Sequence, residues 1–367
     1  MKSDRFREIQ RAEAVRRDGL FQGGAAVMVV VGLFFALGCA PWPWGQNRPT
    51  GLVAMEPVQY NAIDLAIIPD IKLPSSVDLT DDMPPAGDQG DQGSCVAWAV
   101  AYALKTHQEQ VERTWGADTT DHQFSPAYVY NQIKVGGCNS GARIPDGFTL
   151  LANQGCCTLA TMPYDDSACD DAPPATARAE AQTYRIASWR RVDIQNTAEL
   201  RSHLAAGSPI VIGMEVYTNF FRLSGDAIYD DIGGNWEGNH ALCVIGYDDA
   251  AATFRVLNSW GAGWGDQGYF RITYALFRQI VFEAYVAQDL VAGKLLLDVS
   301  ATGQGRVHVS PVGGTYETGT QVELTAVPAD GWRFVEWQDA QGHAVNPMIL
   351  AIDADTAVTA VFEEIEP

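Results

Sequence analysis

The stretch DQGDQGSCVAWAV, residues 88–100, places a cysteine where a glycine-rich loop gives way to an apolar run. The segment that starts at this cysteine, CVAWAVAYAL, is apolar on every face of a helix, which is typical of a helix buried on all sides. Cys95 is therefore either a small core residue or a reactive thiol at the first turn of that helix, where the helix dipole lowers a thiol pKa. The rest of the chain decides between these two interpretations.

The composition of the 367-residue chain is that of a folded protein with room for about two domains. Hydrophobic residues make up 47% and charged residues 19%, which is unlike a disordered chain. The 45 acidic and 24 basic residues give a formal net charge of −21. Because a field of this sign repels phosphate backbones, we expect no nucleic-acid partner.

The N-terminus combines a polar leader with an uncharged apolar stretch. Residues 1–24 carry six basic and four acidic side chains, and residues 25–40, AAVMVVVGLFFALGCA, carry none. The apolar length falls between a signal-peptide core and a minimal spanning helix, and the preceding basic residues favour a cytoplasmic N-terminus. ALGC, residues 36–39, resembles a lipoprotein cleavage box with Cys39 as the lipidated residue. A lipid anchor and a transmembrane helix both remain open, and either would place the rest of the chain outside the cytoplasm, attached to the cell envelope.

The seven cysteines are compatible with such an exported protein, in which disulfides can form. Cys243 lies in an apolar strand, so we expect a buried free thiol there. Four cysteines between residues 138 and 169 can make one or two bridges, and their spacing does not fix the connectivity. The chain has no CxxC or HExxH motif, so we expect no metal site and no cofactor.

The chain divides into a leader, a linker and two domains, and the pattern predicts an α+β fold. We expect residues 1–40 to be the leader and anchor, residues 41–73 a tether and residues 74–292 the main domain. The first half of the main domain has helical segments at 125–133, which begins with the capping residue Ser125, and at 144–155. Its second half has β-branched and aromatic runs, and helices followed by strands favour α+β. The runs are PIVIGMEV (209–216), HALCVIGYDD (240–249), TFRVLNSW (253–260), GYFRITY (268–274) and FEAYVAQ (282–288).

Residues 293–367 alternate short strands with Gly, Pro and Asp turns, which predicts a small all-β domain. This segment resembles the bacterial β-repeat of internalin-type surface proteins. The resemblance is carried by GRVHVSPVGGTYETGTQVELTAVPADGWRFVEW at 305–337 and by AVTAVFEE at 357–364. It implies a partner at the cell surface or in the extracellular space.

A nucleophilic cysteine needs an imidazole nearby, and His240 is the best of six histidines because it begins an apolar strand after glycine-rich turns. Asn258, at the end of the next strand, is placed to accept the outer imidazole N–H with its side-chain carbonyl. Trp260 would shield that hydrogen bond from water. An oxyanion would be stabilised by the side-chain amide of Gln89 and the backbone N–H of Cys95.

The main domain resembles papain-like cysteine peptidases over about residues 74–290. The resemblance is carried by DQGDQGSC, GNHALCVIGY and LNSWGAGWGDQGYF. It implies a helical lobe and a barrel-like β lobe with a peptide-binding cleft between them. The roles it implies are nucleophile for Cys95, general base and then acid for His240, orienting residue for Asn258, oxyanion donor for Gln89, and peptide-binding residues for Gly141 and Trp260.

The sequence also departs from that family. The family has a cysteine three residues before the nucleophile, where this chain has Gln92, and its usual disulfide partner corresponds to Cys138. Cys138 would then pair with Cys169 or with one of the adjacent cysteines 156 and 157. Only about 33 residues separate the anchor from the domain, too few for the family's long inhibitory propeptide. The restraint on activity is left open.

Three functions are compatible with these residues. The first is an exported, membrane-attached endopeptidase acting on peptides or proteins. The second is a surface binding or adhesion protein whose peptidase domain is inactive or accessory. The third is a transpeptidase that uses the same acyl-enzyme. The co-occurrence of Cys95, His240, Asn258 and Gln89 favours the first, because an inactive domain has no need of all four.

Overall fold

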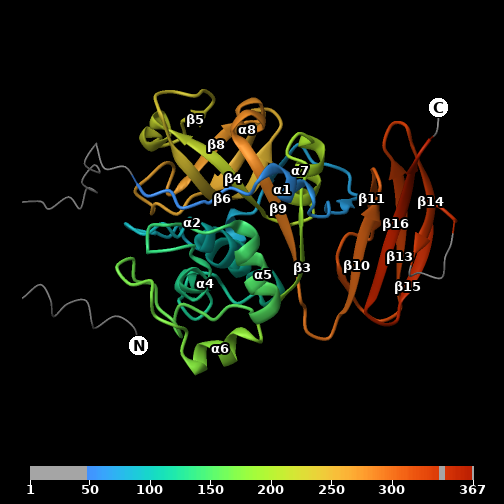
Figure 1. Cartoon of the computed structure of the whole chain (residues 1–367), viewed down its shortest axis with the longest axis horizontal. Coiled ribbons are helices and arrows are strands. Elements are labelled where there is room, and N and C mark those ends of the chain that lie inside the picture. Colours follow the sequence, from blue (N-terminus) through green and yellow to red (C-terminus); the bar gives the residue numbers. More distant parts are fainter. Residues whose placement is uncertain (1–47, 339–343, 366–367) are drawn as a thin grey trace, which may run out of the picture. The chain divides into compact units, whose positions relative to one another are not determined.

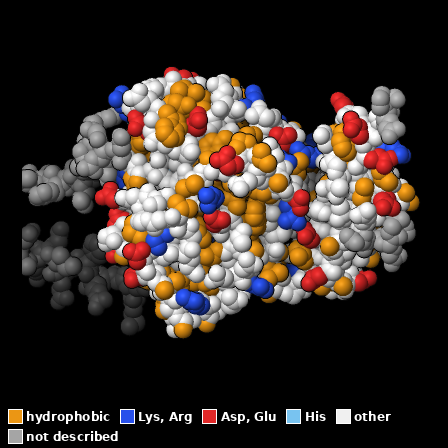
Figure 2. All heavy atoms as spheres, viewed as in Figure 1, with side chains coloured by type: hydrophobic (Ala, Val, Ile, Leu, Met, Phe, Trp, Pro, Cys, Tyr) orange, Lys and Arg blue, Asp and Glu red, His pale blue; other side chains and the backbone are white. Residues whose placement is uncertain are grey.

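The computed structural model describes residues 48–338 and 344–365 (Figure 1). The predicted leader, the apolar stretch and Cys39 lie outside these residues. In the part of the chain that the structure describes, no helix has both the length and the apolar character needed to span a membrane. On the face shown in Figure 2, acidic, basic and apolar side chains are interspersed.

The first half of the main domain is helical, as predicted. The helix that begins at Cys95 runs through α2 (Cys95–Ala97), the π-helical segment η2 (Trp98–Lys105) and α3 (Thr106–Arg113). Every residue of α2 and η2 is buried, which confirms the helix expected from its all-apolar faces. The other helices of this half are α4 (Pro126–Ile133), capped by the Ser125 side chain, α5 (Ile144–Gln154) and α6 (Ala175–Ala181).

The second half forms one eight-stranded sheet in the order β3-β9-β4-β6-β7-β8-β5, with β2 paired to β6. The five predicted runs correspond to β4, β6, β7, β8 and β9, which confirms the α+β class. The strand bounds are β2 (Ser76–Asp78), β3 (Ile186–Arg191), β4 (Ile210–Tyr217), β5 (Ile228–Tyr229), β6 (Trp236–Asp248), β7 (Thr253–Leu257), β8 (Tyr269–Thr273) and β9 (Val281–Asp289).

Two helices in this half were not predicted, α7 (Thr197–Ala205) and α8 (Tyr274–Ile280). Each begins after a residue whose side chain caps the first turn: Asn196 accepts from Glu199 N–H, and Thr273 accepts from Leu276 N–H. Both are short, and α8 joins β8 to β9 without a glycine or proline between them. The β-branched and aromatic runs on either side therefore concealed α8. The short 3-10 turns are η1 (Thr80–Asp82) and η3 (Thr218–Arg222).

The C-terminal segment is all-β, as predicted, and its two four-stranded sheets enclose one apolar core. One sheet has the order β1-β11-β13-β15 and the other β12-β10-β16-β14. In the first of these sheets, the edge strand β1 (Ile68–Pro69) pairs in parallel with β11. Both β1 and the preceding helix α1 (Pro57–Asn61) belong to the segment that we expected to be a tether. The remaining bounds are β10 (Leu295–Thr302), β11 (Gly305–Ser310), β12 (Thr315–Tyr316), β13 (Thr320–Pro328), β14 (Trp332–Gln338), β15 (Met348–Ile352) and β16 (Thr356–Glu364).

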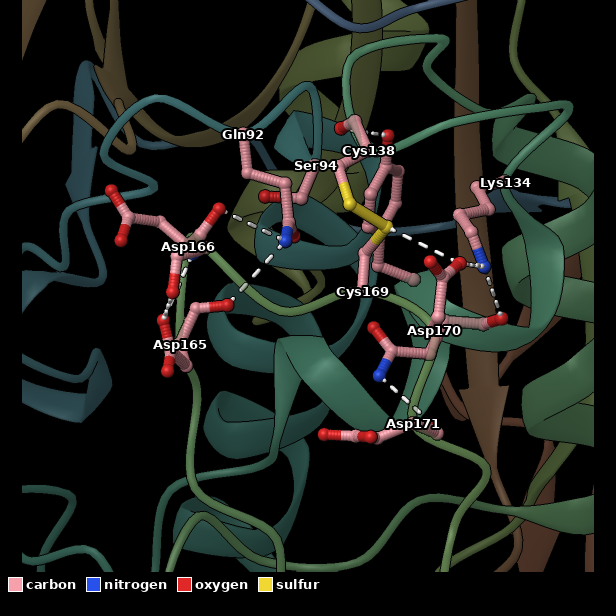
Figure 3. The surroundings of a disulfide bond; sticks show 12 residues. Gln92, Ser94, Lys134, Cys138, Asp165, Asp166, Cys169, Asp170 and Asp171 are labelled. Carbon is pink, nitrogen blue, oxygen red and sulfur yellow. Dashed lines mark hydrogen bonds and ion pairs between the residues drawn. A yellow bond between two sulfur atoms is a disulfide. The ribbon is translucent and has the colours of Figure 1, made fainter.

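One disulfide joins Cys138 to Cys169, which is one of the pairings that the sequence left open (Figure 3). Cys156 and Cys157 are buried free thiols, and so is Cys243, as predicted. Next to the disulfide, the side-chain amide of Gln92 lies 3.5 Å from two backbone carbonyls of the 165–166 turn. Gln92 therefore braces the loop before Cys95 by hydrogen bonds, at the position where the resemblance led us to expect a cysteine.

Candidate active site

Cys95 is the first residue of α2, and its thiol is completely buried. The backbone N–H of Ala241, in β6, points at its Sγ from 3.4 Å. Ala241 directly follows His240, so the structure brings the predicted nucleophile of the helical half against the strand that carries the predicted base. Cys95 and Ala241 belong to the same apolar cluster, which joins the helical half to the sheet.

His240 is oriented by Asn258, as the sequence predicts. Its Nε2 lies 2.8 Å from Asn258 Oδ1, and because an amide oxygen only accepts, we assign the proton to Nε2. The lone pair is then on Nδ1, which has no hydrogen-bond partner among the described residues. Trp260 stacks on the imidazole with ring centroids 4.8 Å apart and is itself buried. The ring of Trp260 thus covers the His240–Asn258 pair, and Nδ1 is the atom left to take a proton.

Gln89 is held in place by a residue that the sequence analysis missed. Ser259 Oγ donates to Gln89 Oε1 at 2.6 Å, and the Gln89 backbone N–H donates to the Ser259 carbonyl at 2.9 Å. The Gln89 amide nitrogen is therefore turned the other way, toward the carbonyls of Gln92 at 2.8 Å and Pro49 at 3.1 Å. Ser259 lies between Asn258 and Trp260 in the LNSW motif, so its position in the sequence was a usable signal.

Gly141 stands where a side chain would not fit, and its neighbour Ala142 makes the backbone hydrogen bonds. Gly141 has φ of +76°, and a Cβ there would lie 2.2 Å from the carbonyl oxygen of Gly51. The N–H of Ala142 donates to Gly51 O and its carbonyl accepts from Val53 N–H, both at 2.9 Å. The peptide-binding role expected for Gly141 stays a prediction.

Burial sets the protonation states of the two central groups. It raises the pKa of the Cys95 thiol to about 11, although backbone N–H groups from Ala241 and Gly51 oppose this. Burial also lowers the pKa of His240 to about 4, and the hydrogen bond to Asn258 opposes that change. The helix dipole at Cys95 was expected to lower the thiol pKa, whereas these shifts favour the neutral form of both groups at pH 7. The reason is physical: both side chains are fully buried, and desolvation disfavours each charged form.

Comparisons with known proteins identify the family. Residues 73–287 match the family model described as papain family cysteine protease. The chain belongs to this family. Its members are cysteine-type peptidases, and the match confirms the resemblance seen in the sequence. Residues 295–366 match a divergent InlB B-repeat domain, which confirms the second resemblance.

Individual relatives agree with this assignment. A peptidase C1-like protein of Acanthamoeba polyphaga mimivirus is 30% identical over 205 residues, covering 51% of this chain and 63% of that protein. Cathepsin B-like CP3 of Giardia intestinalis is 28% identical, covering 59% of this chain and 76% of its own length. Among solved structures, xylellain, a cysteine protease from Xylella fastidiosa, superposes with a TM-score of 0.56 at 28% identity, over 67% of this chain and 98% of its own.

Proposed function

We propose that this protein is an endopeptidase that cleaves peptide bonds through a covalent thioester at Cys95. The proposal is carried by two neighbouring contacts. His240 is hydrogen-bonded to Asn258, and Ala241, which follows His240 in β6, contacts the Cys95 sulfur. Membership of a cysteine protease family gives the reaction class, and this geometry supports the role that we propose for each residue.

The reaction begins with transfer of the thiol proton to Nδ1 of His240. The sulfur then attacks the substrate carbonyl carbon, and the oxyanion is stabilised by the Cys95 backbone N–H and the Gln89 amide. The imidazolium returns its proton to the leaving amine, which leaves a thioester. His240 next takes a proton from water as the water oxygen attacks the thioester carbonyl, the C–S bond then breaks, and the imidazolium returns the proton to the Cys95 sulfur as the acid leaves. Throughout, Asn258 keeps the imidazole in the tautomer that exposes Nδ1.

A comparison of two buried cysteines tests this proposal. Cys95→Ala should abolish hydrolysis of a casein substrate by the purified full-length protein without unfolding it. The matched control is Cys243→Ala, because Cys243 is also a buried free thiol but has no proposed role. Circular dichroism checks the fold of both variants. Hydrolysis by Cys95→Ala at the wild-type rate would exclude the assignment of the nucleophile.

We also propose export and attachment to the cell envelope. The apolar stretch at residues 25–40 supports it, and so does the Cys138–Cys169 disulfide, because such bonds persist in oxidising compartments. Mass spectrometry of the membrane-extracted N-terminus tests the two forms of anchor. A chain that begins at a lipidated Cys39 indicates a lipoprotein, an intact leader indicates a spanning helix, and a chain found only in the soluble cytoplasmic fraction contradicts the proposal.

The match of the C-terminal domain to an InlB B-repeat favours an additional surface-binding role, for which the peptidase would be accessory. Product analysis separates the candidate functions. Hydrolysis gives a free carboxylate, and transpeptidation gives a new amide when an amine is added. A well-folded protein that gives neither product supports the binding role.

A further inference from the structure

The two proposed oxyanion donors stand at opposite ends of one short loop. Gln89 contributes its side-chain amide, and Cys95, which follows the loop, contributes its backbone N–H. We call residues 89–94, QGDQGS, the oxyanion loop. An oxyanion is stabilised fully only while both donors point at the same place, so the shape of this loop decides how well the pair works.

The oxyanion loop holds its own shape weakly. Two of its residues, Gly90 and Gly93, are glycines, which allow the backbone many conformations. Within the loop, the Gln92 N–H donates to the Gln89 carbonyl at 3.3 Å and the Ser94 N–H donates to the Gln92 carbonyl at 2.9 Å. Contacts from outside the loop must therefore fix its two ends relative to each other.

The hydroxyl of Tyr164 contacts both ends of the loop. It donates to the Gln89 carbonyl at 2.8 Å, and it lies 2.6 Å from Ser94 Oγ. Because a hydroxyl has a single proton, the hydrogen between Tyr164 and Ser94 belongs to Ser94 Oγ. Two hydrogen bonds in series, from Ser94 through Tyr164 to Gln89, thus connect the ends of the loop.

The bond to Ser94 acts on the backbone donor. The Ser94 carbonyl and the Cys95 N–H belong to one planar peptide unit, so the orientation of one sets the orientation of the other. The Ser94 carbonyl accepts from the Trp98 N–H at 3.2 Å, in the first turn of the helix that begins at Cys95. With its carbonyl held by the helix and its side chain held by Tyr164, Ser94 fixes the direction of the Cys95 N–H.

The bond to Gln89 acts on the side-chain donor. The Gln89 backbone is held on both sides, because its N–H donates to the Ser259 carbonyl at 2.9 Å and its carbonyl accepts from Tyr164. Ser259 Oγ also holds the far end of the Gln89 side chain. Ser259 therefore orients the amide, whereas Tyr164 sets the position of Gln89 relative to Cys95.

Tyr164 is itself well held and keeps its proton. Its ring packs edge-on against Trp98, which lies on the same helix as Cys95, with ring centroids 4.9 Å apart. Burial raises the pKa of Tyr164 to about 12, so the hydroxyl remains a donor at neutral pH.

The residues that follow Tyr164 also pack against the oxyanion loop. The Asp91 N–H donates to Asp166 Oδ2 at 3.0 Å. Gly90 has φ of +58°, and a Cβ there would lie 1.9 Å from the same carboxylate oxygen. Residues 164–166 thus fit against the loop closely enough that position 90 requires glycine.

The disulfide joins this turn to a second segment that holds the loop (Figure 3). The Gly93 N–H donates to the carbonyl of Cys138 at 3.1 Å, and Cys138 is bonded to Cys169, which follows Asp166 by three residues. The Gln92 amide, which faces the carbonyls of the 165–166 turn, lies between the two segments in sequence contacts but adds no link to Gln89 or Ser94 through its side chain. Tyr164 alone makes side-chain contacts of this kind to both ends among the described residues.

We propose that Tyr164 is a positioning residue of the peptidase reaction, whose hydroxyl fixes the Gln89 amide and the Cys95 N–H relative to each other around the oxyanion. This inference rests on the proposed function, in which Cys95 is the nucleophile and Gln89 an oxyanion donor. Tyr164 does not touch the substrate, and it acts only through Gln89 and Ser94.

The test uses Tyr164→Phe, which keeps the ring against Trp98 and removes only the hydroxyl. Tyr247→Phe is the matched control, because the Tyr247 hydroxyl also donates to a backbone carbonyl, that of Pro74 at 2.7 Å, and has no contact with the oxyanion loop. Peptide hydrolysis by the purified full-length proteins gives kcat and KM, and urea titration gives their stability.

Alkylation of Cys95 by iodoacetamide is the second readout. The sulfur displaces iodide from carbon, and no oxyanion forms, so this rate reports the thiol and its access but not the oxyanion donors. Mass spectrometry of the Cys95 peptide measures it. A purely structural role of Tyr164 would change stability, or both rates together, whereas a positioning role changes hydrolysis alone.

We expect Tyr164→Phe to lower kcat about tenfold, with KM and the alkylation rate within about twofold of the wild type and Tyr247→Phe unchanged. Ser94→Ala should also lower kcat, and the double variant should be no slower than Tyr164→Phe, because both bonds belong to one series. If Tyr164→Phe is unfolded by circular dichroism, Ser94→Ala alone decides by the same two readouts.

A folded Tyr164→Phe protein with the kcat of the wild type would overturn the inference and leave the proposed function standing. Equal losses in hydrolysis and alkylation would overturn it too, since Tyr164 would then act on the thiol. A wild type whose Cys95 is alkylated but which hydrolyses no peptide contradicts the proposed function itself, and the inference falls with it.

Discussion

The hydrogen bond from Ser259 to Gln89 leads to a prediction about catalysis. Ser259→Ala leaves Gln89 Oε1, in a fully buried side chain, without its 2.6 Å partner. An unsatisfied buried acceptor costs about 1–3 kcal/mol, so the free energy of unfolding should fall by about that amount. The Gln89 amide then keeps only the hydrogen bonds of its nitrogen to the carbonyls of Gln92 and Pro49, so its orientation toward the oxyanion is held less firmly. Since a complete oxyanion donor contributes roughly 10²–10³ in kcat, partial loss of its orientation should lower kcat by about 10- to 100-fold.

The assay is peptide hydrolysis by the purified full-length protein. We expect kcat to fall and KM to stay within about twofold, because Gln89 acts on the oxyanion and not on the bound ground state. Ser202→Ala is the control, since Ser202 Oγ donates only to a carbonyl of its own helix, α7. If Ser259→Ala lowers stability but leaves kcat unchanged, the hydrogen bond is structural and Gln89 is not the oxyanion donor.

Two further predictions concern stability. Burial raises the pKa of Glu283 from 4.5 to about 7, so the folded state binds the extra proton between these values. The contribution of Glu283 to the free energy of unfolding should therefore fall by on the order of 3 kcal/mol as pH rises from 4.5 to 7 and then level off, and the difference between the wild type and Glu283→Gln in urea titrations should change by that amount over this range. Cys138→Ser should lower the free energy of unfolding by roughly 4 kcal/mol, because the bridge closes a loop with a sequence separation of 31, and a reductant should then have no added effect on the urea midpoint.

The sequence predicted the elements that its periodicity and motifs encode. The all-apolar run after Cys95, the cap at Ser125 and the β-branched strands depend on residues that are neighbours in the chain, and each appears where expected. The His240–Asn258 pair was predictable because β6 and β7 are neighbouring antiparallel strands, and His240 lies in β6 while Asn258 directly follows β7.

The sequence could not give what depends on contacts between distant backbones. Residues 48–53 are held against the peptidase domain largely by N–H and carbonyl groups, which carry no residue identity, and position 51 requires glycine only because Gly93 and Gly141 lie opposite it. The protonation states of Cys95 and His240 could not be predicted from the sequence either. They follow from complete burial of Cys95 and His240, and that burial involves a segment more than 40 residues away from Cys95 in the chain.

The fit of Gly51 against Gly93 has a consequence for evolution. A Cβ at position 51 would lie 1.9 Å from the carbonyl oxygen of Gly93, so any other residue there would force two backbone segments apart without touching the thiol or the imidazole. Selection should therefore keep this codon for glycine, although the residue it encodes has no side chain.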